Sequence, residues 1–127
     1  MAIHSFRDLI AWQKGMNLVR AVYQVSQRLP GDERFGLVSQ MRRAAISVPA
    51  NIAEGHGRSS TADFLRFLDM AIGSCSELET QLLACEMLGY VKTQEIVPAI
   101  DLAQECQRVV KGLKTSLLNN PKKDIRT

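Results

Sequence analysis

A chain of 127 residues is long enough to bury one hydrophobic core and too short to build several domains. A hydrophobic share of 46%, a charged share of 23% and a net charge of +3 are ordinary for a globular protein, and they exclude a highly charged disordered chain. The sequence contains neither a run of roughly 20 apolar residues nor the apolar core of a signal peptide, so we expect no membrane partner and a cytoplasmic location.

The first predicted helix covers residues 6–28. Apolar side chains recur there every three or four positions, as they do on one face of a helix: Leu9, Trp12, Met16, Val19 and Tyr23. Pro30 and Gly31 then predict a stop and a turn. Asp32 is the candidate N-cap of the second helix.

The second predicted helix runs to the glycines at 55 and 57 and carries two stripes. The apolar stripe is formed by Leu37, Met41, Ala44, Val48 and Ile52. The polar stripe repeats at spacings of four, four, three and four, and consists of Arg43, Ser47, Asn51, Glu54 and Arg58. Pro49 removes one backbone hydrogen bond and predicts a bend. The glycines at the end predict a left-handed cap.

The third predicted helix begins with Ser60 as N-cap and Asp63 three residues later, the spacing of a capping box. Its apolar residues alternate by four and three through three heptads: Phe64, Leu68, Ala71, Cys75, Leu78, Leu82 and Cys85. Gly73 lies behind this stripe, where we expect another backbone to approach closely. The fourth predicted helix starts near Thr93 and ends at Asn119.

Four helices with short connections predict an all-α fold, an antiparallel up-down-up-down four-helix bundle. We expect one domain over residues 1–121 and a basic, flexible tail over residues 122–127.

Residues that usually carry catalysis form no recognisable constellation in this sequence. The two histidines lie in different regions without a Glu-x-x-His motif, and the three cysteines form no CxxC pair. No nucleophile motif is present, and the glycines at 55 and 57 do not follow a strand as a phosphate loop would. We therefore predict that the protein is not an enzyme and binds no metal or cofactor.

The polar stripe of the second helix has two candidate partners, a polar stripe on the third helix or a neighbouring molecule. Charges of both signs at matched helical spacing suit a hydrogen-bonded protein interface better than a phosphate groove. We expect Asn51, Glu54 and Arg58 to have structural roles, with Arg58 offsetting the cost of a buried Glu54. The predicted oligomer interface or polar network comprises Arg43, Ser47, Asn51, Glu54, Arg58, Arg66, Glu77 and Thr80.

Two further hypotheses remain open at this stage. A small-ligand site or enzyme pocket would use the cluster Arg42, Arg43, Glu54 and Arg58. A nucleic-acid contact would use the basic segment at the end of the fourth helix and in the tail. Its acidic neighbours along the chain are Asp124 and Glu105, which lies one turn before Arg108. The cations of this segment are Arg108, Lys111, Lys114, Lys122, Lys123 and Arg126. The same charges also suit the solvated last turn of a helix, where cations are favoured.

Two long stretches carry a family resemblance, QMRRAAISVPANIAEGHGR from residue 40 and DFLRFLDMAIGSCSELETQL from residue 63. They resemble the "four helix bundle protein" family, which includes the proteins encoded in intervening sequences of bacterial 23S ribosomal RNA genes. The accessory variability proteins of diversity-generating retroelements are more distantly similar. The resemblance implies a four-helix bundle that assembles with itself into a homopentameric ring, with structured RNA or DNA as a further partner. It implies no catalytic residues.

Overall fold

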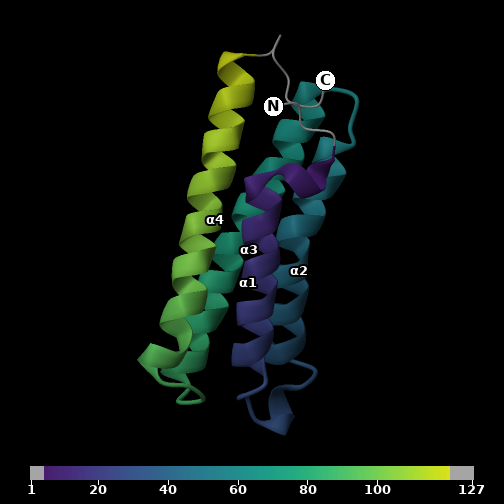
Figure 1. The fold of residues 1–127 in the computed structure, drawn as a ribbon. Coiled ribbons are helices and arrows are strands. Elements are labelled where there is room, and N and C mark those ends of the chain that lie inside the picture. The colour runs from purple at the N-terminus through teal and green to yellow at the C-terminus, as the bar shows by residue number, and fades with distance from the viewer. Residues whose placement is uncertain (1–4, 121–127) are drawn as a thin grey trace.

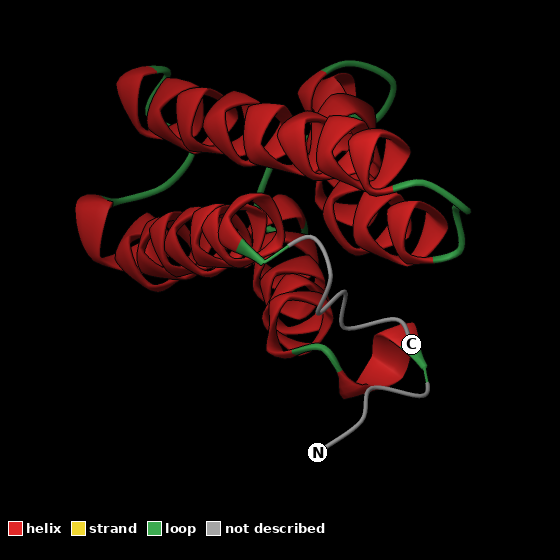
Figure 2. Cartoon of the chain, turned by 90° about the horizontal axis from the view of Figure 1, so that it is seen from above, coloured by secondary structure: helices red, strands yellow, loops and turns green. Residues whose placement is uncertain are grey.

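The computed structural model describes residues 5–120, and every regular element in that range is helical (Figure 2). Four long helices make up the fold: α1 (Ile10–Ser26), α2 (Leu37–His56), α3 (Thr61–Met87) and α4 (Thr93–Asn119). Successive helices are joined at alternate ends and run in opposite directions (Figure 1). The predicted all-α, four-helix fold is confirmed. Within residues 5–120, no helix combines the length and apolar character needed to cross a membrane.

The first helix begins later than predicted, because a separate 3-10 helix, η1 (Phe6–Asp8), precedes it. The Ser5 hydroxyl accepts a hydrogen bond from the Arg7 amide, and the Asp8 carboxylate accepts one from the Ser5 amide. This capping box provides acceptors for the amides of a single helical turn. Leu9 then takes an extended conformation, which separates this turn from α1. The sequence pattern missed the break because Leu9 keeps its apolar register across it.

The start of α2 also differs from the prediction. Residues Gly31–Glu33 form a second 3-10 helix, η2, so Asp32 does not cap α2, which begins only after Gly36. The Glu33 carboxylate accepts a hydrogen bond from the Leu37 amide at 3.3 Å and thereby satisfies one of the first N–H groups of α2. Its other oxygen accepts a hydrogen bond from the Tyr90 hydroxyl at 2.9 Å, which links the two loops at this end of the bundle.

Glycines end the helices in two different ways. Gly57 follows α2 with a φ of −80°, so the predicted left-handed cap is wrong at this position. Gly89 follows α3 with a φ of +79°, and its neighbour Tyr90 donates an amide hydrogen bond to the Cys85 carbonyl, as in a Schellman motif. Between these ends, the Ser60 hydroxyl accepts a hydrogen bond from the Asp63 amide, which confirms Ser60 as the N-cap of α3.

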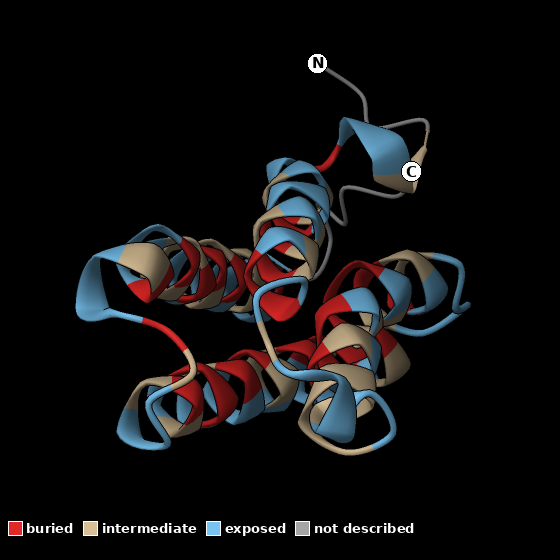
Figure 3. Cartoon of the chain, turned by 90° about the horizontal axis from the view of Figure 1, so that it is seen from below, coloured by how far each residue is buried: buried red, intermediate tan, exposed pale blue. Residues whose placement is uncertain are grey.

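The core lies between the four helices, with buried residues on their inward faces (Figure 3). Each helix packs against two others in the cyclic order α1, α2, α3, α4 and back to α1. The apolar stripes predicted for the second and third helices supply much of this core, and all three cysteines are free and buried within it. The stripe predicted for the first helix is displaced from the core: Met16 is 43% exposed, whereas the buried residues of α1 include Leu18, Val22 and Val25. The largest fully buried side chains include Leu18, Met41, Ile52, Phe64, Leu78 and Val110.

Two glycines allow close helix packing that the sequence pattern did not reveal. A Cβ at Gly15 of α1 would lie 3.3 Å from the Pro49 ring, so Pro49 packs directly on α1 while α2 continues through it. A Cβ at Gly55 would lie only 2.7 Å from the Phe67 Cβ, so α2 and α3 approach each other most tightly there.

Candidate oligomer interface

The α2–α3 seam carries a hydrogen-bonded polar network on its outer side. The Ser47 hydroxyl bonds to the Ser74 hydroxyl of α3 at 2.6 Å and to the Ala44 carbonyl of its own helix at 2.7 Å. The Asn51 amide donates to the Ser47 carbonyl at 2.8 Å. Of the residues predicted for this network, Ser47 bonds across the seam, and its partner is Ser74, which the pattern did not select.

A cavity of about 270 Å³ opens beside this network and is lined by Gln40, Arg43, Ala44, Ser47, Glu77 and Gln81. Arg43 and Glu77 are both exposed, and no ion pair within residues 5–120 includes either of them. Gln81 is only 8% exposed, and its side-chain oxygen has no hydrogen-bond partner among the described residues. The cavity thus places two solvated charges of opposite sign beside one buried acceptor, and only the Gln81 oxygen is costly to leave without a donor.

The C-terminal part of the polar stripe, Glu54 and Arg58, is more exposed than predicted. Arg58 pairs with Glu54 at 2.9 Å, but 55% of the Glu54 side chain and 41% of the Arg58 side chain remain exposed. The expectation of a buried Glu54 is therefore wrong, because its helical position points past the seam into solvent. The guanidinium groups of Arg58 and Arg66 lie 4.7 and 4.8 Å from the centroid of the Phe67 ring. Arg66 also pairs with Asp63 at 3.6 Å.

The outer face of α3 is open. Gly73 is exposed, and a Cβ there would meet no atom within 4 Å, so no backbone among residues 5–120 makes the predicted close approach. Thr80 is also exposed, and its hydroxyl bonds to the Ser76 carbonyl of the same helix. Ile46 and Met70, one on each helix, are each 45% exposed next to the polar residues. We call this region, from Arg43 to Asn51 on α2 and from Met70 to Gln81 on α3, the α2–α3 face.

The hypothetical pocket around Arg42, Arg43, Glu54 and Arg58 is not assembled as one site. Arg42 points away from the α2–α3 face towards α1, where its Nε donates to the Ser26 hydroxyl at 2.9 Å. Its guanidinium lies 4.6 Å from the centroid of the Tyr23 ring. Within the part of the chain that the structure describes, no group of three or more histidine, cysteine, aspartate or glutamate residues could hold a metal ion.

The basic segment of α4 is only partly free of acidic partners. Arg108 and Lys111 are exposed without an ion pair among residues 5–120. Lys114, however, pairs with Asp69 of α3, a partner that neighbours along the sequence could not reveal. The other three predicted cations, Lys122, Lys123 and Arg126, lie outside the described residues.

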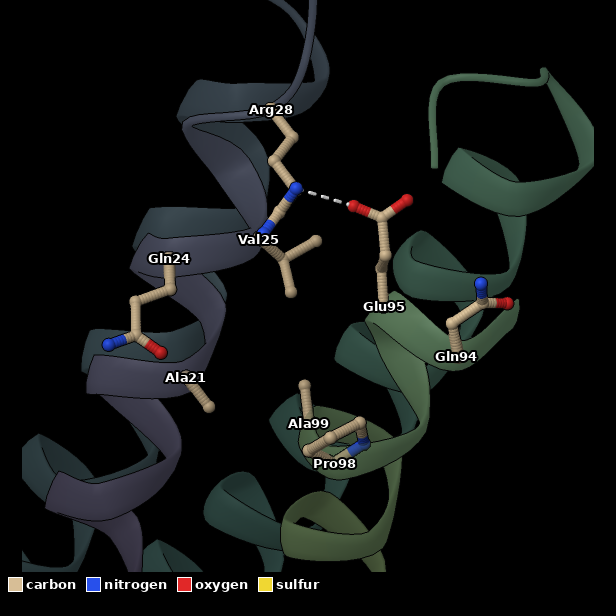
Figure 4. A pocket seen from close by; sticks show the side chains of 8 residues that line it. All are labelled: Ala21, Gln24, Val25, Arg28, Gln94, Glu95, Pro98 and Ala99. Atoms are coloured by element: carbon tan, nitrogen blue, oxygen red, sulfur yellow. Dashed lines mark ion pairs between the residues drawn. The ribbon is translucent and has the colours of Figure 1, made fainter. Parts of the chain in front are cut away.

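A second cavity, of about 280 Å³, lies between α1 and α4 near the loop end of the bundle (Figure 4). Its apolar wall comes from Ala21, Val25, Pro98 and Ala99, and its polar rim from Gln24, Arg28, Gln94 and Glu95. Arg28 and Glu95 form an ion pair of 2.7 Å at one edge. Nothing in the sequence indicated this site, because its two halves lie on the first and last long helices and share no motif.

The fold defines a class of small all-α protein built on four packed helices. The chain belongs to the family described as 23S rRNA-intervening sequence protein, whose family model matches residues 7–112. This confirms the family resemblance seen in the sequence.

One solved structure illustrates how far the fold is shared. The crystal structure of a protein with unknown function from the S23 ribosomal protein family of Bacteroides thetaiotaomicron is similar, with a TM-score of 0.76 and 20% identity. The alignment covers 83% of this chain and 98% of that chain. No curated protein matches the sequence.

Proposed function

We propose that the protein is a non-enzymatic assembly protein that binds further copies of itself through the α2–α3 face. The observation that carries this proposal is the cavity lined by Arg43, Glu77 and Gln81. In an interface, Arg43 of one copy would pair with Glu77 of the next, and the Gln81 oxygen would gain a donor. Burial of charges is tolerated in an interface only with such pairing.

The surroundings of the cavity support this assignment. Ile46 and Met70 supply exposed apolar area beside the charges, and Gly73 leaves room for the backbone of another copy to approach. Arg43 and Glu77 line the same cavity, so they can pair between copies across a two-fold axis or head to tail, and a head-to-tail contact closes into a ring when the rotation permits. The family resemblance selects five copies, and five chains of 14.1 kDa give about 70 kDa.

Charge reversal tests this proposal directly. Arg43→Glu places two acids at the interface, and Glu77→Arg places two cations there, so each variant alone should reduce the particle mass measured by light scattering. The double variant restores opposite charges and should recover the assembled mass. Arg108→Glu on α4 is the matched control and should leave the mass unchanged. A monomeric wild-type protein at micromolar concentration would contradict the proposal.

Nucleic-acid binding is a second candidate function, favoured by Arg108 and Lys111, which are exposed on α4 and form no ion pair among residues 5–120. A ring would repeat this pair in every subunit, so weak phosphate contacts could add through multivalency. We propose structured RNA or duplex DNA as the partner, contacted at the backbone rather than at base edges.

A further inference from the structure

Phe35 is the most exposed large hydrophobic side chain among the described residues, with 87% of its surface open. It lies in the loop between η2 and α2, at the end of the bundle where the α1–α2 and α3–α4 connections meet (Figure 1). Isolated exposed apolar side chains are common, but an aromatic ring presented almost completely to solvent is typical of a binding anchor.

The loop holds Phe35 in place by several contacts. Amide hydrogen bonds from Glu33 to the Pro30 carbonyl and from Gly36 to the Glu33 carbonyl fold the backbone into successive tight turns. The Glu33 side chain ties the loop both to the start of α2 and to Tyr90. A loop that is already ordered loses little conformational entropy on binding, so Phe35 is preorganised as an anchor.

The α1–α4 cavity is a suitable receptor for such a ring. A cavity of roughly 150 Å³ is enough to hold benzene, and this one is larger, at about 280 Å³. Ala21, Val25, Pro98 and Ala99 give it an apolar wall, as Figure 4 shows. The cavity and Phe35 also lie at the same end of the bundle, so two copies can each present both elements to the other.

The rim of the cavity carries hydrogen-bond acceptors that suit Arg34, the residue before Phe35. The Arg34 guanidinium lies 5.4 Å from the centroid of the Phe35 ring, and no ion pair within residues 5–120 occupies it. Pro98 has no amide hydrogen, so the Gln94 carbonyl lacks its usual donor within α4 and remains an acceptor at the rim. The Gln24 side chain adds a second acceptor.

We propose that Phe35 of one copy inserts into the α1–α4 cavity of a second copy, with Arg34 donating to acceptors at the rim. The contact is isologous, because each copy contributes one ring and one cavity. It is separate from the proposed assembly interface, since the α1–α4 seam lies opposite the α2–α3 face in the cyclic order of the helices. The two contacts can therefore coexist in one particle.

A lipid surface fits this end of the molecule less well. The two connections, together with the last turn of α3 and the first turn of α4, carry three cations, Arg28, Arg34 and Lys92, against four acids, Asp32, Glu33, Glu86 and Glu95. Anionic membranes attract clusters of basic residues, and this end has no basic excess. A second copy of the chain, with a matching cavity, is the better occupant.

The test uses two complementary variants and methyl NMR. Phe35→Ala keeps the cavity but lacks the ring, and Ala21→Trp keeps the ring but fills the cavity. We expect the Ala21, Val25 and Ala99 methyl signals of labelled Phe35→Ala protein to shift on titration with unlabelled Ala21→Trp protein. Gln24→Trp, at the exposed rim, replaces Ala21→Trp as the cavity block if the latter does not fold.

Two controls make the result decisive. An unlabelled donor that carries both Phe35→Ala and Ala21→Trp should cause no shift, because it retains the α2–α3 face but has no ring to insert. A donor that combines Ala21→Trp with Met87→Ala, which removes another strongly exposed side chain at this end, should still cause the shift. Equal shifts with and without Phe35 on the donor, or no shift with any donor, would overturn the proposal.

Discussion

At the scale of single residues, two glycines in neighbouring helices have opposite surroundings. Gly55 is enclosed by Phe64 and Phe67, whereas Gly73 faces open space. We expect Gly55→Ala to destabilise the protein by about 1–3 kcal/mol, because the new methyl group overpacks the α2–α3 seam. In the unassembled chain, Gly73→Ala should stabilise the fold by up to about 1 kcal/mol, the difference in helix propensity. Thermal unfolding of both variants measures this contrast, and equal destabilisation by the two would contradict it.

The Glu54–Arg58 pair gives a second prediction at this scale. Both side chains are largely exposed, and exposed pairs one helical turn apart contribute little to stability. We expect Glu54→Ala to change the free energy of unfolding by less than about 0.5 kcal/mol. Chemical denaturation provides the measurement. A loss several times larger would mean that Glu54 is enclosed in the assembled protein rather than exposed.

At the scale of elements, α4 carries two kinds of cation. Arg108 and Lys111 form no ion pair among the described residues, whereas Lys114 is paired with Asp69. If α4 contacts nucleic acid, replacing Arg108 and Lys111 together by glutamine should weaken gel shifts of structured RNA and duplex DNA. The effect should be largest at low salt, because phosphate contacts release counterions. Lys114→Gln is the matched control and should matter less, since Asp69 already neutralises Lys114. Wild-type protein that gives no shift at low salt would refute nucleic-acid binding.

Local periodicity was sufficient to predict the four helices and most of the core, but not the 3-10 turns before α1 and α2, the buried face of α1 or the contacts between elements. The heptads of α3 placed Phe64 and Leu78 in the core because burial on a helix repeats with its turn. Lys114 and Asp69 lie 45 positions apart, and Tyr90 and Glu33 lie 57 apart, so no local pattern joins either pair. The polar stripe of α2 predicted where Arg43 lies on the helix. The lack of an ion-pair partner for Arg43 and the burial of Gln81 depend instead on how α2 packs against α3.

At the scale of the whole molecule, the buried thiols report on the integrity of the core. Burial is the main reason that the pKa of Cys85 rises from 9.0 to about 11. The pKa of Cys75 is also raised, first by its hydrogen bond with Cys106 and then by burial. The same hydrogen bond lowers the pKa of Cys106, so burial rather than pKa is what protects all three thiols. The folded protein should therefore resist alkylating reagents at neutral pH, and all three cysteines should react only after unfolding.

The same burial predicts how stability depends on pH. The unfolded chain releases the Cys85 proton near pH 9, whereas the folded protein holds it until about pH 11. The stabilising contribution is therefore fully present below pH 9 and is lost as the pH rises towards 11. Denaturation at a series of pH values should show this decline, and Cys85→Ala should flatten it. A decline that is equally steep in Cys85→Ala would assign it to other groups.

The packing of α1 against α4 brings together the two helices that are farthest apart along the chain. The first and last described turns also lie towards the same end of the bundle in Figure 1. All four seams would therefore survive a circular permutation that joins α4 to α1 by a linker and opens the α1–α2 connection. Such a chain would read α2, α3, α4, α1 and should keep its helical content in circular dichroism. Because the opened connection contains Phe35, the permutant would separate the folding of the bundle from whatever that loop binds.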